Sequence, residues 1–144
     1  MFIGEYNHTL DFKRRLAIPA KFRGIFQGKA VVTKGLDGCL FIYTEKVWEG
    51  IAEKLSNIPL GEKRMRQFVR TMLSGAIESE VDKQGRILIP NFLSQFALLK
   101  KDVVLVGLYD RLEAWDKEAW EKSRLVAEKE QEQVAEELGK MGIY

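Results

Sequence analysis

The feature of this sequence that most constrains its fold is an internal repeat. Residues 11–15 and residues 82–86 both read Asp-x-x-x-Arg, and each is followed by an apolar run that ends in Ile-Pro. The two motifs are 71 residues apart, and further similar residues recur at a spacing of 71 or 72. Such a repeat indicates two copies of one structural unit. We predict that residues 5–58 form the first copy and residues 76–124 form the second.

Each motif is predicted to form the tip of a β-hairpin, and we name residues 11–15 the first tip and residues 82–86 the second tip. Residues 77–81 and 87–89 on either side of the second tip have the composition of strands. Gly85 near the end of the loop suits a type I turn closed by a left-handed residue. Asp82 can accept a hydrogen bond from the backbone two residues further on.

The remaining elements repeat in the same order within each copy. Pro19 or Pro90 ends the strand after the tip and can start a short helix. Two further strands follow, and then a longer helix begins at Thr44 or at Asp116, both good N-caps. Each copy is too small to bury enough surface alone. We therefore expect a mainly β fold with helices (α+β), in which the two copies interleave into one β-barrel-like body with pseudo-two-fold symmetry and both tips on one side.

Two helical segments lie outside the copies. Residues 59–75 are predicted to be a linking amphipathic helix, and residues 125–144 an acidic C-terminal helical tail that packs only in part. Lys63, Arg66 and Arg70 share one face of the linking helix. That face is either simply solvated or in contact with nucleic acid.

The distribution of charge is more informative than the net charge of +2. Residues 1–90 carry fifteen basic and ten acidic side chains, and residues 91–144 carry eight and eleven. This asymmetry indicates an anionic partner for one part of the molecule. No apolar run approaches the roughly 18 residues of a membrane span. The single cysteine, Cys39, excludes an internal disulfide, so we expect a cytoplasmic protein with no signal peptide and no membrane contact.

The tips are the candidate DNA-binding site. Arginine reads guanine O6 and N7 with a bidentate fork, which makes Arg15 and Arg86 the candidate base contacts. Asp11 and Asp82 would orient the turns. The alternative is that each Asp and Arg only brace the turn through a local ion pair. The further candidate contacts, to phosphates or to adenine, are Lys13, Arg14, Lys83 and Gln84.

Sequence motifs for catalysis or for a cofactor are absent. His8 and Cys39 are the only residues of their types and stand far apart with no nucleophile signature, so structural roles are expected. Glu78, Glu80 and Asp82 alternate along a strand, where they could bind a hard cation or form a solvated edge. We expect no enzyme activity, no metal, no cofactor and no small-molecule substrate.

Several segments resemble the MraZ family of bacterial transcriptional regulators, which are built from two SpoVT-AbrB-type domains. The resemblance covers nearly the whole chain. It implies a swapped-hairpin β-barrel fold and binding to double-stranded DNA at short G-rich direct repeats. It further implies control of the division and cell-wall gene cluster, typically as a repressor. It also implies a nucleoid-associated homo-oligomer, in the form of a ring. The similar segments are residues 1–5, the two tips with the Ile-Pro that follows each, residues 37–40 and residues 74–76.

The chain departs from the family pattern at one residue. Family members usually have glycine before the first motif arginine, where this chain has Arg14. A left-handed residue other than glycine costs on the order of 1 kcal/mol, so either the first turn differs or the added charge compensates on DNA. A rival hypothesis is an oligomeric scaffold that binds protein partners and has only incidental DNA affinity.

Overall fold

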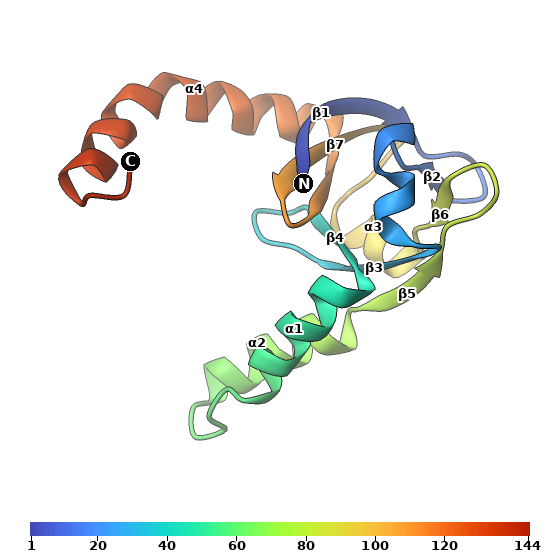
Figure 1. Ribbon diagram of the computed structural model, residues 1–144, viewed down its shortest axis with the longest axis horizontal. Coiled ribbons are helices and arrows are strands. Elements are labelled where there is room, and N and C mark those ends of the chain that lie inside the picture. Colours follow the sequence, from blue (N-terminus) through green and yellow to red (C-terminus); the bar gives the residue numbers. More distant parts are fainter.

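The computed structural model describes residues 1–144. Two similar units make up the chain, and each has four strands, a short helix after its second strand and a longer helix after its fourth strand (Figure 1). The elements of the first half are β1 (Phe2–Thr9), β2 (Arg15–Ala17), the 3₁₀ helix η1 (Ala20–Phe26), β3 (Lys29–Lys34), β4 (Leu40–Thr44) and α1 (Glu45–Ser56). Those of the second half are α2 (Lys63–Ser74), β5 (Ile77–Glu80), β6 (Arg86–Leu88), α3 (Asn91–Phe96), β7 (Asp102–Tyr109), β8 (Leu112–Asp116) and α4 (Lys117–Lys140).

The two copies exchange their first strands. The six-stranded sheet has the order β1-β7-β8-β4-β3-β5, so β1 of the first copy pairs with β7 of the second, and β5 of the second pairs with β3 of the first. The strands β4 and β8 pair at the centre. The strands β2 and β6 form a separate antiparallel ribbon. This order reads the same from either end once the copies are interchanged, as a pseudo-two-fold axis requires.

The larger core lies between the ribbon and one face of the sheet. Strand residues alternate between the two faces of a sheet, and the inward-facing residues of β3, β4, β7 and β8 meet apolar side chains of the ribbon, η1 and α3. Leu16 and Ile87 on the ribbon are almost fully buried. They pack with Val32, Ile42, Leu105 and Leu112 of the sheet.

The other face of the sheet is covered by helices. Val47, Trp48, Ile51 and Leu55 of α1 pack on a second core that includes Phe41, Tyr43 and Trp115. The helix α1 begins where the side chain of Thr44 accepts a hydrogen bond from Val47 N at 3.2 Å, and α4 begins in the same way at Asp116. These caps satisfy backbone N–H groups that a helix start leaves free.

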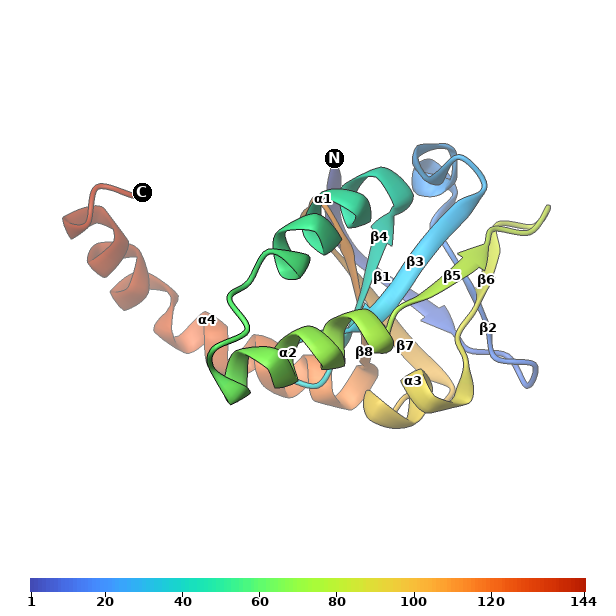
Figure 2. The same ribbon diagram turned by 90° about the horizontal axis from the view of Figure 1, so that it is seen from below.

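Two helices extend away from the sheet and stay largely exposed (Figures 1 and 2). Of the predicted apolar stripe of α2, only Met72 is buried, and Phe68 remains 43% exposed. The 24-residue helix α4 has no buried residue. No helix in the chain combines the length and the apolar character that crossing a membrane would require.

The predicted α+β fold with two interleaved copies is confirmed, and one detail differs. The strands form an open six-stranded sheet and a two-stranded ribbon, whereas a closed barrel would be hydrogen-bonded all the way around. The ribbon is hydrogen-bonded to the sheet only locally. Ser79 Oγ of β5 bonds both the N–H and the carbonyl of Leu88 in β6.

Candidate nucleic-acid interface

The first tip is held by the carboxylate of Asp11. Asp11 Oδ1 accepts hydrogen bonds from Lys13 N and from Arg15 N, both at 2.9 Å, and Oδ2 accepts one from Arg15 Nε at 2.7 Å. Arg14 N donates to Asp11 O at 2.9 Å, which closes the turn. One aspartate therefore fixes both the backbone of the tip and the direction of the Arg15 side chain.

The second tip repeats this network. Asp82 Oδ1 accepts from Gln84 N and from Arg86 N at 2.9 Å, and Oδ2 accepts from Arg86 Nε at 2.9 Å. Gly85 N donates to Asp82 O at 2.9 Å. The predicted turn, closed by a residue in the left-handed region, is present in both copies, because Arg14 has φ 60° and Gly85 has φ 79°.

These hydrogen bonds also set the charge of the two aspartates. Backbone donation, first of all from Arg15 N, lowers the pKa of Asp11 below its ordinary value, and donation from Arg86 N does the same to the pKa of Asp82. Both carboxylates therefore stay ionised near neutral pH. Each ion pair uses Nε of the arginine, which leaves the two terminal guanidinium nitrogens free for another partner.

The register of the ribbon places the two motif arginines on one face. Ala17 lies opposite Arg86, and Arg15 lies opposite Leu88. Arg15 is two residues from Ala17 and so shares its face, which puts the Cα atoms of Arg15 and Arg86 roughly 8 Å apart. Leu16 and Ile87 on the opposite face point into the core, so both arginines face outward.

Both tips project from one end of the molecule (Figures 1 and 2). Lys13, Lys83 and Gln84 are exposed there. The helix α2, which carries Lys63, Arg66 and Arg70, extends toward the other end (Figure 2). The structure therefore brings the six predicted DNA contacts to one end and places the basic face of α2 apart from them.

Arg14 and Arg23 differ from the other basic residues near the tips. The guanidinium of Arg14 is bound to the side chains of Asn91 and Ser94 on α3. Arg23 follows the first tip in sequence, yet its side chain covers Gly85 of the second tip. The helix η1 therefore turns the side chain of Arg23 toward the other copy.

Phe12 is a residue of the first tip that the motif analysis did not select. Its side chain is 88% exposed, and Lys13 Nζ lies 5.7 Å from the centre of its ring. It is the most exposed phenylalanine of the chain, and it stands beside the residues that are predicted to contact DNA. The sequence could have identified Phe12 as a candidate contact, because the corresponding residue of the second tip is Lys83, which was selected as one.

The remaining candidates have structural surroundings. Burial is the main cause that raises the pKa of the Cys39 thiol to about 12, so the thiol stays protonated. Burial and the nearby charge of Arg23 lower the pKa of His8. Glu78 accepts a salt bridge from Lys29 at 3.2 Å, and no group of three His, Cys, Asp or Glu residues in the chain is arranged to hold a metal ion.

Comparison with known proteins identifies the family. A sequence model described as "MraZ protein, putative antitoxin-like" matches the chain twice, over residues 1–71 and 72–140. A protein named transcriptional regulator MraZ from Caldanaerobacter subterraneus subsp. tengcongensis is 48% identical over 143 residues, which cover 99% of this chain and 100% of the relative. Relatives of the same name from Thermoanaerobacter pseudethanolicus and Clostridium tetani are each 47% identical, with 99% of this chain and 100% of each relative covered. The chain therefore belongs to the MraZ family of transcriptional regulators.

Proposed function

We propose that the two tips bind double-stranded DNA and read guanines in short G-rich direct repeats. The observation that carries this proposal is the pair of outward-facing arginines, each braced by an aspartate through Nε. The brace and the recognition of DNA are compatible, because the terminal guanidinium nitrogens that guanine O6 and N7 require are left free. A side chain that is already oriented loses less conformational entropy on binding.

The other residues of the tips would supply affinity and register. Lys13 and Lys83 stand exposed beside the arginines, where they would neutralise phosphates. Arg14 can add its charge to the same backbone, and Gln84 can reach adenine. Asp11 and Asp82 have the orienting role.

Selection of bound sites from random duplex DNA tests the proposal. The expected result is an enriched G-rich repeat, with binding to that repeat that weakens steeply with salt because phosphate contacts release counterions. A protein that binds all sequences equally at moderate salt would instead be a scaffold with incidental DNA affinity.

We infer the regulatory role from the family resemblance. The chain would act in the cytoplasm at the nucleoid, as a repressor of the division and cell-wall gene cluster. In this proposal residues 5–58 and 76–124 are the two DNA-binding copies, residues 59–75 link them, and residues 125–144 form the tail. Reporter activity from the upstream region of that cluster, with and without the protein, distinguishes a repressor from an activator.

We further propose that copies of the chain assemble head to tail into a ring. The two exposed helices supply complementary faces. Residues 63–74 of α2 carry four basic and no acidic side chains, with the apolar side chains Met65 and Phe68 each 43% exposed. The helix α4 carries seven acidic and five basic side chains.

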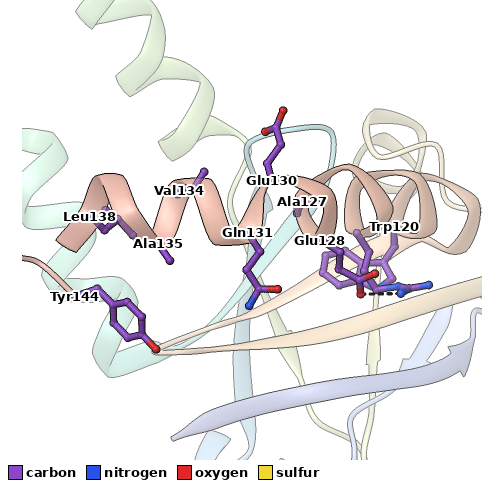
Figure 3. Close-up of a pocket in the computed structure, with 10 residues that line it drawn as sticks. Trp120, Ala127, Glu128, Glu130, Gln131, Val134, Ala135, Leu138 and Tyr144 are labelled. Atoms are coloured by element: carbon purple, nitrogen blue, oxygen red, sulfur yellow. Dashed lines mark hydrogen bonds and ion pairs between the residues drawn. The ribbon is translucent and has the colours of Figure 1, made fainter. Parts of the chain in front are cut away.

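An open groove on α4 offers a place for α2 of a second copy (Figure 3). Its volume is about 630 Å³, and Glu128 and Glu130 lie among its apolar lining. A contact between two different surfaces of identical chains forms a ring when its rotation closes. A ring would present many tips to tandem repeats, so that several weak contacts act together. The apolar residues that line the groove are Trp120, Ala127, Val134, Ala135, Leu138 and Tyr144.

Native mass measurement tests the assembly. We expect Phe68→Asp to reduce the number of subunits, and Lys46→Glu, a change of charge on the exposed face of α1, to leave it unchanged. Arg64→Glu should weaken the assembly, and Glu130→Lys in the same chain should restore it. An unchanged mass for Phe68→Asp would show that α2 is not part of the interface.

A further inference from the structure

Residues 14 and 85 occupy equivalent places in the two copies, and each is the point where a tip meets the other copy. Arg14 O accepts a hydrogen bond from Ile89 N at 2.8 Å, and Gly85 O accepts one from Ile18 N at 2.8 Å. Both residues lie in the left-handed region. The backbone is therefore the same at the two positions, although one side chain is long and charged and the other is a hydrogen atom.

At the second tip, the space beside Gly85 is filled by Arg23 of η1. A Cβ atom at position 85 would lie 2.0 Å from Arg23 Nε. Arg23 Nε donates to Ile18 O at 2.9 Å, which holds the guanidinium over the glycine. Gly85 is buried as a result.

At the first tip, the corresponding space is filled from the opposite direction. The residue that matches Arg23 at the spacing of 71 is Ser94, which is small and 5% exposed. Arg14 extends from the tip toward it, and Arg14 Nη1 donates to Asn91 Oδ1 and, at 3.3 Å, to Ser94 Oγ. Each tip is thus joined to the short helix of the other copy by one guanidinium.

We propose that Arg14 and Arg23 are positioning residues that lock the tips in the orientation needed for DNA. The two pairs are reciprocal: the large Arg14 faces the small Ser94, and the small Gly85 faces the large Arg23. We call each contact between a tip and the short helix of the other copy a junction. Two arginines at one junction would place like charges in contact, and two small residues would leave the tip unsupported. The inference rests on the proposed function of the tips.

The first test separates positioning from direct contact of Arg14 with phosphate. The double variant Asn91→Ala/Ser94→Ala keeps the charge of Arg14 and removes its partners. Positioning predicts an affinity for the selected repeat about tenfold lower, of the size expected for a lost hydrogen bond to a charged group, with the salt dependence unchanged. Arg14→Lys, which keeps the charge but loses the planar fork, should bind as weakly as this variant. Binding like the wild-type protein in both variants would overturn the proposal.

The second test rebuilds one junction in the form of the other. Ser94→Arg alone should lower the thermal midpoint of unfolding, because it brings a second guanidinium against Arg14. Arg14→Gly/Ser94→Arg reproduces the pair found at the second tip and should recover the midpoint and most of the affinity. A double variant that is no better than Ser94→Arg alone would show that the two junctions are not interchangeable.

A third measurement does not depend on DNA. The N–H groups of Ile89 and Ile18 donate to the backbone of the two tips, so their hydrogen exchange reports whether each tip is locked. In Asn91→Ala/Ser94→Ala we expect faster exchange at Ile89 and unchanged exchange at Ile18, and the reverse in Arg23→Ala. If this pattern appears in a protein with no preference for any DNA sequence, the lock stands and the proposed function fails. Equal exchange in all variants would refute the lock itself.

Discussion

The first and second tips have the same backbone and different surfaces, and this contrast shows what determines the turn. Each aspartate accepts two backbone N–H bonds and one guanidinium bond. Gly85 suits the left-handed position, but Arg14 adopts it with φ 60°. The strain of a non-glycine residue there is on the order of 1 kcal/mol, which the Asp11 network and the hydrogen bonds of Arg14 can offset. The aspartate therefore determines the turn more strongly than the glycine does.

The surfaces of the tips differ at every position between the aspartate and the arginine. The first tip presents an exposed phenylalanine and a lysine, and the second presents a lysine and a glutamine. Two copies of a turn can thus hold an arginine in the same way and offer DNA different neighbours. The following changes test how far this equivalence extends.

The largest effect is expected from loss of the motif arginines. Arg15→Ala and Arg86→Ala should each weaken binding to the selected repeat by about 1–3 kcal/mol, the value of one good base contact. Fluorescence anisotropy with a labelled duplex measures the change. Lys122→Ala, which removes an exposed charge on α4, serves as the control. If only one arginine matters, the two tips are equivalent in structure but not in recognition.

A smaller effect, on stability, is expected at the left-handed position of the second tip. Gly85→Ala adds a Cβ atom that collides with Arg23 Nε and has to adopt φ 79°. We expect a loss of about 2 kcal/mol in the free energy of unfolding, measured by urea denaturation. In Arg23→Ala/Gly85→Ala the collision is absent and only the backbone strain remains, so the second substitution should cost less there than in the wild-type background. Equal costs in the two backgrounds would argue against the packing of Arg23 on Gly85.

The pH dependence of stability should be shared by the tips. The pKa values of Asp11 and Asp82 are lowered by the fold, so their stabilising contribution is complete above the unfolded value near pH 4. This contribution is lost as the pH falls from that value through the lower pKa values that the two aspartates have in the folded protein. The pKa of His8 is also lowered by the fold. The free energy of unfolding should therefore begin to fall below about pH 6.5, because the unfolded state takes up the proton of His8 before the folded state does.

Urea denaturation across this pH range separates the two contributions. Asp11→Asn/Asp82→Asn should flatten the decline of the free energy of unfolding at acidic pH. The change that begins near pH 6.5, which belongs to His8, should be the same as in the wild-type protein. A decline below pH 4 that persists in full in this variant would assign the acid sensitivity to other carboxylates.

The smallest effect is expected at Phe12. Because this side chain is 88% exposed, Phe12→Ala should change the free energy of unfolding by less than about 0.5 kcal/mol. Its DNA affinity should fall by a few fold, because phenylalanine at the tip can contact a sugar or a thymine methyl group. Phe12→Lys, which imitates the second tip, distinguishes an apolar contact from a simple gain of charge. Unchanged affinity in both variants would remove Phe12 from the binding surface.

Local sequence patterns predicted the parts of the fold that depend on neighbouring residues. The turn follows from Asp82 and Gly85, and the helix starts follow from Thr44 and Asp116, whose side chains accept hydrogen bonds from backbone N–H groups three residues on. The spacing of 71 predicted the two copies, and the small size of each copy predicted that they interleave, because neither can bury enough surface alone.

Contacts between distant residues were not predictable from these patterns. Arg14 bonds to Asn91 and Ser94, which are 77 and 80 residues away. Nothing near Arg14 in the sequence indicates this partner. The apolar period of α2 was correctly identified as helical, but Phe68 stays 43% exposed because no other part of the chain covers it.

The exchange of β1 and β5 has a consequence for biosynthesis. While the ribosome is still making the second half, β1 has no β7 with which to pair, and β3 has only β4 as a neighbour. The nascent first half therefore has to remain open, with unpaired strand edges, until translation is nearly complete. Pairings between such distant segments also form slowly, so the newly released polypeptide passes through a stage in which chaperones can bind it.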